Sequence, residues 1–249
     1  MKYNQVFFDY VDEGAIRSAE VIVKHLFPLL KPDSVLDVGC GRASWLRAWK
    51  NAGCRQVQGI DGDYIDRAQL HIAQDEFKPV NLSQTFDLGQ RFDLVQCLEV
   101  AEHIAAGPAT GLIDSLVRHG DIILFSAAVP GQGGTQHINK KPLEHWRDRF
   151  VDRGYRAFDA LRPLIHTNAR IEPWYRYNSI LYANASGEAR LAPGLLHGAT
   201  GKHDTFRDYA PLPWRIRRAV FRYLPVRAVN QVAVLNARLH RLHPSSRPA

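Results

Sequence analysis

The chain has 249 residues, 45% of them hydrophobic, so it can bury the core of one large domain with an appendage. Its formal net charge of +7 is uneven, because residues 200–249 carry ten Arg and Lys against two Asp, a net of +8. Residues 1–199 are therefore close to neutral, at −1, which argues against a basic nucleic-acid groove along them, and no nucleic-acid partner is expected.

Cysteine usage and the first residues indicate a cellular compartment. Cys40, Cys54 and Cys97 are too few and too scattered for a disulfide framework or a zinc site. Residues 1–10 are too polar for a signal peptide, and the sequence holds no run of about 18 apolar residues. We therefore expect a protein of the reducing cytoplasm that does not cross a membrane.

The hydrophobic pattern predicts alternating helices and strands. Residues 16–30 have helical apolar spacing, and the apolar run at 34–38 is typical of a buried strand. A helix with Trp45 and Trp49 on one face comes next and ends at Gly53. Further strands are predicted at residues 57–61, around 77–82, 92–100 and 121–128.

The later part of the chain continues this alternation and then departs from it. One helix is predicted around Ile113, and another opens at Pro142 and stops at Gly154. The last two apolar runs, at 155–161 and 178–183, have no helix predicted between them. We therefore expect these two runs to form an antiparallel pair.

This order of elements predicts an α/β fold. It is a doubly wound, Rossmann-like sheet of seven strands with helices on both faces, followed by a basic helical C-terminal extension. An all-parallel dinucleotide-binding sheet would not finish in an antiparallel pair. The predicted boundaries are a main domain at 1–190, a linker at 191–210 and a helical tail at 211–249.

The most informative segment is the turn after the first predicted strand. Asp37 closes the apolar run, Gly39 and Gly41 let backbone approach a ligand, and a helical pattern begins directly after them. Asp61 stands at the tip of the next strand, where a carboxylate can accept both hydroxyls of a ribose. These features predict a cofactor that contains adenosine. NAD does not fit, because a dinucleotide fingerprint would require a third glycine at Ser44.

A second group of polar residues ends the strand predicted at 92–100. Glu99, Glu102 and His103 fall at the carboxyl edge of the sheet, where open α/β folds bind ligands. They suit a divalent cation such as Mg²⁺ or Mn²⁺, or they only cap the next helix and hydrogen-bond its loop. His137, in a glycine-rich loop after the following strand, is a candidate base for a substrate hydroxyl, a fourth ligand of the cation, or a structural residue of the loop. The sequence leaves these alternatives open.

Seven short motifs together resemble the class I S-adenosylmethionine (SAM) methyltransferases, and within them a bacterial family associated with polysaccharide and glycolipid biosynthesis. The resemblance covers roughly residues 7–183, and its motifs are Ser18-Ala-Glu-Val, the turn at 34–43, Gly59-Ile-Asp-Gly-Asp63, Arg91-Phe-Asp-Leu, Glu99-Val-Ala-Glu-His, Phe125-Ser-Ala-Ala-Val-Pro-Gly-Gln-Gly-Gly134 and Trp174-Tyr-Arg-Tyr-Asn178. The Glu-x-x-Glu-His pattern is similar to that of the ubiquinone-pathway catechol O-methyltransferases and the small-RNA terminal 2′-O-methyltransferases. In those two families a metal grips two adjacent oxygens of the acceptor.

The sequence departs from the family at two places. Ala43 stands where many members carry a third glycine, and Lys140-Lys141 replaces the usual Glu-Gln. The lysines imply that the acceptor is anionic or that the metal site is altered.

The resemblance and the geometry of the sheet imply which residues meet the cofactor and the metal. The expected SAM contacts are Ser18, Asp37, Gly39, Cys40, Gly41, Asp61, Gly62, Asn81, Leu82 and Leu98. Arg17 is the alternative to Ser18 for the cofactor carboxylate. The expected catalytic residues are Glu99 and His137, and the expected metal ligands are Glu99, Glu102, His103 and His137.

Three functions compete on this basis. The leading one is a metal-assisted O-methyltransferase that acts on a sugar hydroxyl of a glycan or glycolipid precursor. The second is a small-molecule O-methyltransferase acting on a catechol or natural-product hydroxyl, since Trp174 and Tyr175 can stack an aromatic ring as well as a pyranose. The third is a non-catalytic SAM-fold binding subunit. Amino-methylation of DNA is disfavoured because the strand before Glu99 lacks the Asn/Asp-Pro-Pro-aromatic motif.

The tail combines apolar and basic residues. Trp214, Ile216, Val220, Phe221 and Leu224 interleave with Arg215, Arg217, Arg218 and Arg222. This pattern predicts a basic amphipathic helix ended by Pro225, with a second helix at 226–242. Such a helix suits an anionic inner-membrane surface, a partner enzyme, the main domain itself or a second subunit of a homo-oligomer.

Overall fold

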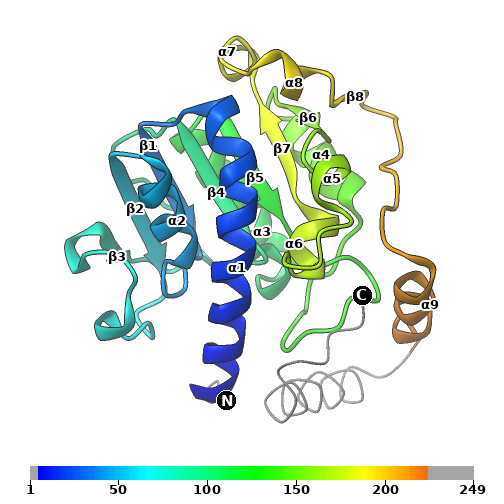
Figure 1. The fold of residues 1–249 in the computed structure, drawn as a ribbon, viewed down its shortest axis with the longest axis horizontal. Helices are drawn as coiled ribbons and strands as arrows, with labels where there is room; N and C mark the ends of the chain where they lie inside the picture. Colours follow the sequence, from blue (N-terminus) through cyan, green and yellow to red (C-terminus); the bar gives the residue numbers. More distant parts are fainter. Residues whose placement is uncertain (1–4, 224–249) are drawn as a thin grey trace.

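Residues 5–223 are described by a computed structural model, and an eight-stranded sheet forms its centre (Figure 1). The strands are β1 (Ser34–Val38), β2 (Gln56–Asp61), β3 (Phe77–Pro79), β4 (Leu94–Leu98), β5 (Ile122–Ser126), β6 (Arg156–Phe158), β7 (Ile180–Ala183) and β8 (Ala199–Thr200). They lie in the order β3-β2-β1-β4-β5-β7-β6-β8. The first five strands are parallel, whereas β7 is antiparallel to β5 and β6. Strand order reverses between β1 and β4, which is where open α/β sheets bind ligands.

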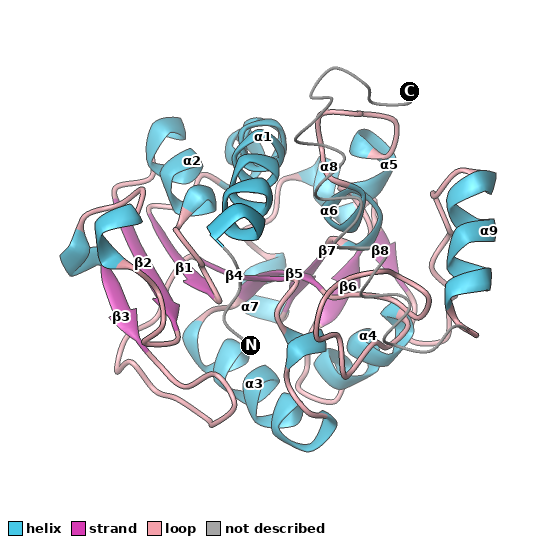
Figure 2. Cartoon of the chain, turned by 90° about the horizontal axis from the view of Figure 1, so that it is seen from below, coloured by secondary structure: helices cyan, strands magenta, loops and turns pink. Residues whose placement is uncertain are grey.

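Helices cover both faces of the sheet. They are α1 (Gln5–Leu30), α2 (Ser44–Ala52), α3 (Ala106–His119), α4 (Leu143–Val151), α5 (Arg162–Ile165), α6 (Pro173–Asn178), α7 (Ala185–Glu188), α8 (Pro193–Leu196) and α9 (Leu212–Phe221). Figure 2 shows α1 and α2 on one side of the sheet and α3 and α4 on the other. The predicted α/β class and its layers are confirmed.

The alternation of side chains along each strand builds two apolar cores. In β5, Ile122 and Leu124 pack in the core beneath α1 and α2, while Ile123 and Phe125 join the core of α3 and α4. All four are almost completely buried. Burying one such side chain contributes about 1.5–3 kcal/mol, so the two cores hold the strands in register.

Several predicted elements need correction. An eighth strand, β8, adds to β6 from within the segment expected as a linker. Two helices, α5 and α6, lie between the runs that were expected to follow each other directly. Their lengths of four and six residues are too short for a helical period to be recognised in the sequence. The pairing of β6 with β7 is antiparallel, as predicted.

Some element ends also differ. The strand predicted at 92–100 stops at Leu98, because Glu99 takes a left-handed φ of 58°. β3 ends at Pro79, which has no backbone N–H for a ladder bond. The first helix begins at Gln5 rather than at residue 16.

The helix predicted at the start of the tail is present as α9. Pro225 and the second helix predicted at 226–242 lie outside the described residues. Among residues 5–223, no helix is both long and apolar enough to cross a bilayer. Cys40, Cys54 and Cys97 are buried and form no disulfide with one another.

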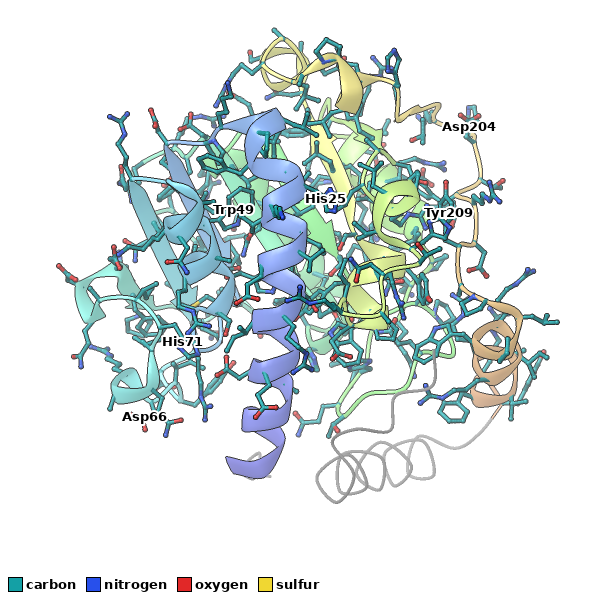
Figure 3. The ribbon with its side chains drawn as sticks, in the orientation of Figure 1. His25, Trp49, Asp66, His71, Asp204 and Tyr209 are labelled. Carbon is teal, nitrogen blue, oxygen red and sulfur yellow. The ribbon has the colours of Figure 1, made fainter. Side chains whose placement is uncertain are left out.

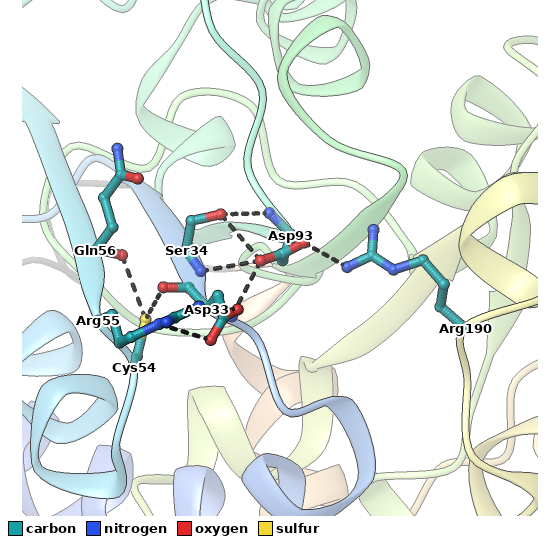
Figure 4. Close-up of polar contacts among 7 residues, drawn as sticks. All are labelled: Asp33, Ser34, Cys54, Arg55, Gln56, Asp93 and Arg190. Carbon is teal, nitrogen blue, oxygen red and sulfur yellow. Dashed lines mark hydrogen bonds and ion pairs between the residues drawn. The ribbon is translucent and has the colours of Figure 1, made fainter.

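Asp93 cross-links the amino ends of β1 and β4, opposite the carboxyl edge (Figure 4). Its Oδ2 accepts the backbone N–H groups of Asp33 and Ser34, both at 3.0 Å, and the Ser34 hydroxyl at 3.1 Å. The Asp93 N–H donates back to Ser34 Oγ at 2.9 Å, and Arg190 donates to Oδ1 at 2.7 Å. One carboxylate therefore satisfies three donors at the start of β1 and one from the segment after α7.

We predict that Asp93→Ala lowers the free energy of unfolding by about 2 kcal/mol, because it leaves partly buried backbone donors without an acceptor. Urea denaturation measures this loss. Asp75→Ala, at an exposed position, is the control and should change stability by less than about 0.5 kcal/mol. Equal losses in the two variants would contradict a structural role for Asp93.

Candidate active site

The turn after β1 bends over the end of β2. The N–H groups of Gly39 and Cys40 both donate to the carbonyl of Ile60, at 2.8 and 3.2 Å. Gly39 has a φ of +81°, and a Cβ there would overlap the Val100 side chain. Gly41, at a φ of +54°, faces open space. Glycine is thus required at the first position by conformation and contact, and at the second by conformation alone.

Asp61, the last residue of β2, fastens this turn. Its Oδ2 accepts the Gly41 N–H at 2.8 Å, and its Oδ1 accepts the Gly62 N–H at 2.7 Å and the Tyr64 hydroxyl at 2.5 Å. The side chain lines a cleft although only 5% of the residue is exposed. A carboxylate has about four lone-pair sites, so Asp61 can still accept a ligand hydroxyl.

The cleft runs along the carboxyl edge of the sheet and has a volume of about 1650 Å³. This is more than the 300–1,000 Å³ typical of a single small-molecule pocket, so it has room for two ligands side by side. Twelve of the predicted site residues line it: Asp37, Gly39, Cys40, Gly41, Asp61, Gly62, Asn81, Leu82, Leu98, Glu99, His103 and His137. The structure therefore brings the turn and the polar group after β4 into one cavity.

Ser18 was predicted to contact the cofactor, but it does not line the cleft. It is fully buried, its hydroxyl donates to the Gly14 carbonyl at 2.7 Å, and it accepts the Glu172 N–H at 2.9 Å. The alternative, Arg17, donates to Glu172 at 3.1 Å. Both residues tie α1 to the start of α6, because they face that segment rather than the cleft.

Asp12 is the cleft residue of α1 that sequence reasoning missed. Its carboxylate accepts from the Ser44 hydroxyl and from His71 Nε2, the latter at 2.9 Å, and lies 3.5 Å from Arg42 Nη1. Figure 3 places His71 at the same end of the molecule as Asp66, below β2. No sequence signal marks this network, since its members come from segments up to 59 residues apart.

Asp37 is buried at the end of β1, and its Oδ2 has no hydrogen-bond partner among the described residues. Burial raises the pKa of Asp37 from 3.8 to about 7. A hydrogen bond from the Gln96 amide lowers this pKa, and the charge of Asp61 raises it. A carboxyl group in this state favours a cationic or donor group beside it in the cleft.

Glu99 is held by a chain of amides that the sequence did not reveal. Gln132 Nε2 donates to Glu99 Oε2, and Asn178 Nδ2 donates to Gln132 Oε1, each at 2.8 Å. Burial raises the pKa of Glu99 to about 7, although the Gln132 hydrogen bond lowers it. Its left-handed backbone is a strained conformation that the surroundings must maintain.

Glu102, His103 and His137 converge beside Glu99. One ligand atom from each of the three lies within 4.8 Å of the others, and Glu102 Oε1 is 3.9 Å from His137 Nε2. Glu99, also predicted as a metal ligand, is not a member of this group. The structure thus keeps three of the four predicted ligands together, while Glu99 accepts from Gln132 and interacts with Glu102.

Several polar atoms of the converging side chains lack hydrogen-bond partners in the described part of the chain. Both carboxylate oxygens of Glu102, and Nδ1 of His137, are buried without a hydrogen-bond partner in the described part of the chain. Burial and then the charge of Glu99 raise the pKa of Glu102 well above its usual range. Burial, followed by His103 and Lys140, lowers the pKa of His137 to about 3. A neutral imidazole beside an unpaired carboxyl group is a suitable environment for a cation.

The other wall of the cleft comes from segments late in the chain. Trp174 and Tyr175 of α6, and Trp214 and Arg217 of α9, line it. Trp174 and Tyr175 are the aromatic residues predicted from the sequence. The contribution of α9 was not expected at this position.

Asp37 should make the stability of the ligand-free protein depend on pH. Its folded pKa of about 7 lies above the ordinary value of 3.8, so its favourable contribution is present below about pH 4 and is lost as the pH rises through 7. We predict that Asp37→Asn is more stable than the wild type at pH 8, on the order of 2 to 4 kcal/mol, and that the difference shrinks toward pH 4. Urea unfolding at several pH values measures it, with the exposed Asp75→Asn as control. A pH-independent difference would contradict the assignment.

Comparisons with known proteins agree with this geometry. A family model described as a methyltransferase domain matches residues 12–161. An O-methyltransferase family protein from Burkholderia thailandensis has the same fold, with 15% identity, a TM-score of 0.54, and coverage of 72% of this chain and 58% of that chain. The chain thus spans less than two thirds of that protein. No curated protein matches the sequence.

Two further solved structures have the fold. The sugar N-methyltransferase KedS8 from a Streptoalloteichus species shows 15% identity and a TM-score of 0.50, over 70% of this chain and 87% of that chain. The plantazolicin methyltransferase BpumL in complex with SAH shows 14% identity and a TM-score of 0.50, over 72% of this chain and 89% of that chain. At these identities the likeness establishes the architecture.

Proposed function

This chain belongs to the methyltransferase-domain family, and we propose that it transfers the methyl group of SAM to a sugar hydroxyl of a glycan or glycolipid precursor, assisted by a divalent cation. The observation that carries this proposal is the cleft in which a glycine turn closed by Asp61 lies beside His103 and His137, on which the fully buried Glu102 converges. The related BpumL structure with SAH supports the choice of cofactor.

The electrostatics of the turn suit SAM. SAM carries a sulfonium and an ammonium group, and Asp37 and Asp61 place carboxyl groups at that end of the cleft. The Asp61 carboxylate would accept a ribose hydroxyl, and Asn81 and Leu82 would border the adenine. A cationic ligand would also relieve the unfavourable burial of Asp37.

The residues present fit a divalent cation. Glu102, His103 and His137 would hold it, since their ligand atoms already converge and several are buried without partners in the described structure. One carboxylate with two imidazoles favours Mn²⁺ over Mg²⁺, which prefers oxygen ligands. Bound there, the cation would supply Lewis-acid polarisation of the acceptor oxygens.

The chain's own residues would then have distinct tasks. His137 would hold the cation with Glu102 and His103, and Glu99, which lines the cleft, would accept the proton of the hydroxyl. Gln132 orients Glu99 and leaves its Oε1 without a described partner. Because the methyl carbon of SAM is already activated by sulfur, the protein contributes mainly alignment and proton removal.

A small-molecule hydroxyl acceptor is the second candidate. Trp174, Tyr175 and Trp214 make the acceptor wall aromatic, so a catechol or a natural-product ring can stack there as a sugar does. Methylation of an amine is a further alternative to test, because KedS8, which has the same fold, is a sugar N-methyltransferase. Mass spectrometry of paired hydroxy and amino sugars and catechols incubated with the enzyme and SAM separates these acceptors.

The outer face of α9 supports a proposal of peripheral attachment. Leu212, Ile216 and Val220 are 65%, 55% and 53% exposed and stand four residues apart, with Arg215 exposed beside them. This face suits an anionic membrane surface or a partner enzyme. Sedimentation with anionic vesicles at low and high salt distinguishes a membrane surface from a partner enzyme. A protein that binds the membrane sediments with the vesicles at low salt, whereas one that binds only a partner enzyme stays in the supernatant.

We predict that Asp61→Ala weakens SAM binding by about 2–3 kcal/mol, the scale of lost charge-assisted hydrogen bonds. Titration calorimetry measures the affinity, and a thermal unfolding scan checks that the variant is folded. Asp152→Ala, at an exposed position beyond α4, is the control. Unchanged affinity in a folded Asp61→Ala protein would show that Asp61 does not bind the cofactor. Absence of SAM binding by the wild type would instead favour the third function, a non-catalytic binding subunit.

We predict that the wild type binds one Mn²⁺ and that Glu102→Gln and His103→Ala each weaken this binding at least tenfold, because each removes a ligand atom. Calorimetry with MnCl₂ measures the affinity, and the rise in melting temperature provides a second readout. His25→Ala on the exposed surface of α1 is the control (Figure 3). Methyl transfer that survives exhaustive chelation, or equal loss in the control, would refute the metal assignment.

A further inference from the structure

Helix α9 is built into the active-site cleft. Figure 1 shows it at the end of the molecule where the glycine-rich loop after β5 emerges. Gly131 in that loop has a φ of +83°, and a Cβ there would overlap the backbone of Arg218. The loop and the helix can approach this closely only because residue 131 has no side chain.

The two faces of α9 differ in chemistry. Trp214, Arg217, Arg218 and Phe221 are half-buried and recur at helical spacing, so they form the face turned toward the loop. Trp214 and Arg217 line the cleft. The guanidinium of Arg217 lies 4.7 Å from the ring centre of Trp214 and 4.8 Å from that of Phe221.

The arginines of α9 have separate positions. Arg215 and Arg218 pair with Asp208, the former at 3.5 Å. Arg217 stands by Gly133, with Nη2 3.5 Å from where a Cβ of that glycine would be.

Charge differs along the cleft. Asp12, Asp37 and Asp61 place carboxyl groups around the glycine turn, where Arg42 pairs with Asp12, whereas the wall formed by α9 carries Arg217. A cationic cofactor suits the glycine turn, and an anionic acceptor suits the α9 wall. A sugar that carries a phosphate or carboxylate offers a partner for each of the wall residues Trp214 and Arg217. Its apolar ring face can stack on Trp214, and its anionic group can pair with Arg217.

We propose that α9 forms the acceptor subsite and that Arg217, stacked on Trp214, binds a phosphate or carboxylate carried by the sugar acceptor. This inference rests on the proposed function, because it specifies the substrate class of the same cleft. The planar guanidinium can bind either anion with two parallel hydrogen bonds, and its position between two rings limits its motion before binding. Residues 212–221 of the predicted tail would in this respect belong to the catalytic unit.

The test compares binding of glucose 1-phosphate, glucuronate and glucose to the full chain saturated with S-adenosylhomocysteine. We expect both anions to bind more tightly than glucose. Arg217→Gln should weaken the anions by about ten- to a hundredfold and leave glucose unchanged. Arg217→Lys, which keeps the charge but loses the fork, should fall in between. The tighter of the two anions identifies phosphate or carboxylate as the group recognised.

Arg215→Gln, on the same helix with its side chain exposed, is the matched control and should bind all three probes as the wild type does. Equal losses in the Arg215 and Arg217 variants, or anion binding that Arg217→Gln does not weaken, would overturn the inference. S-adenosylhomocysteine affinity is measured in every variant. If the wild type does not bind it, the proposed function fails, whereas a loss confined to anion binding in Arg217→Gln supports the subsite independently.

Discussion

The cleft depends on carboxyl groups that the fold withdraws from water. Asp37 at the end of β1 and Glu102 after β4 are almost fully buried, Glu99 is partly exposed in the cleft, and burial raises the pKa of each. Such groups are unfavourable in their charged forms unless a cation or a donor stands beside them. Oδ2 of Asp37, Oε1 of Glu99 and both carboxylate oxygens of Glu102 lack a hydrogen-bond partner among the described residues, so each can accept one more donor or cation.

The rest of the fold keeps these groups in place. Ala43 and Glu99 hold left-handed backbone conformations around the cleft, each costing on the order of 1–2 kcal/mol. The two apolar cores offset that strain, and Asp93 joins β1 and β4 at the far end of the sheet. Stability is thus concentrated in the sheet and its faces, while the strained and desolvated residues are confined to its carboxyl edge.

Two long-range contacts complete the walls. Asp12 of α1 reaches the turn after β1 through Ser44 and His71, and α9 closes against the loop that leads to His137. These segments lie outside the motifs of the sheet, yet both line the cleft. The α9 wall of the cleft consequently comes from a part of the chain remote from the strands that carry the glycine turn.

The sequence alone determined the α/β class, the glycine turn with Asp61, and the proximity of Glu102, His103 and His137, because strand ends and local spacing bring these residues to one edge of a parallel sheet. It did not determine which way Ser18 faces, that Gln132 hydrogen-bonds Glu99, or that α9 lies against Gly131. Those features arise from packing between segments far apart in the chain, where a rotation of one helix or the absence of one Cβ decides the contact. Only the tertiary structure supplies that information, because periodicity records which face of an element is apolar and not which neighbour it meets.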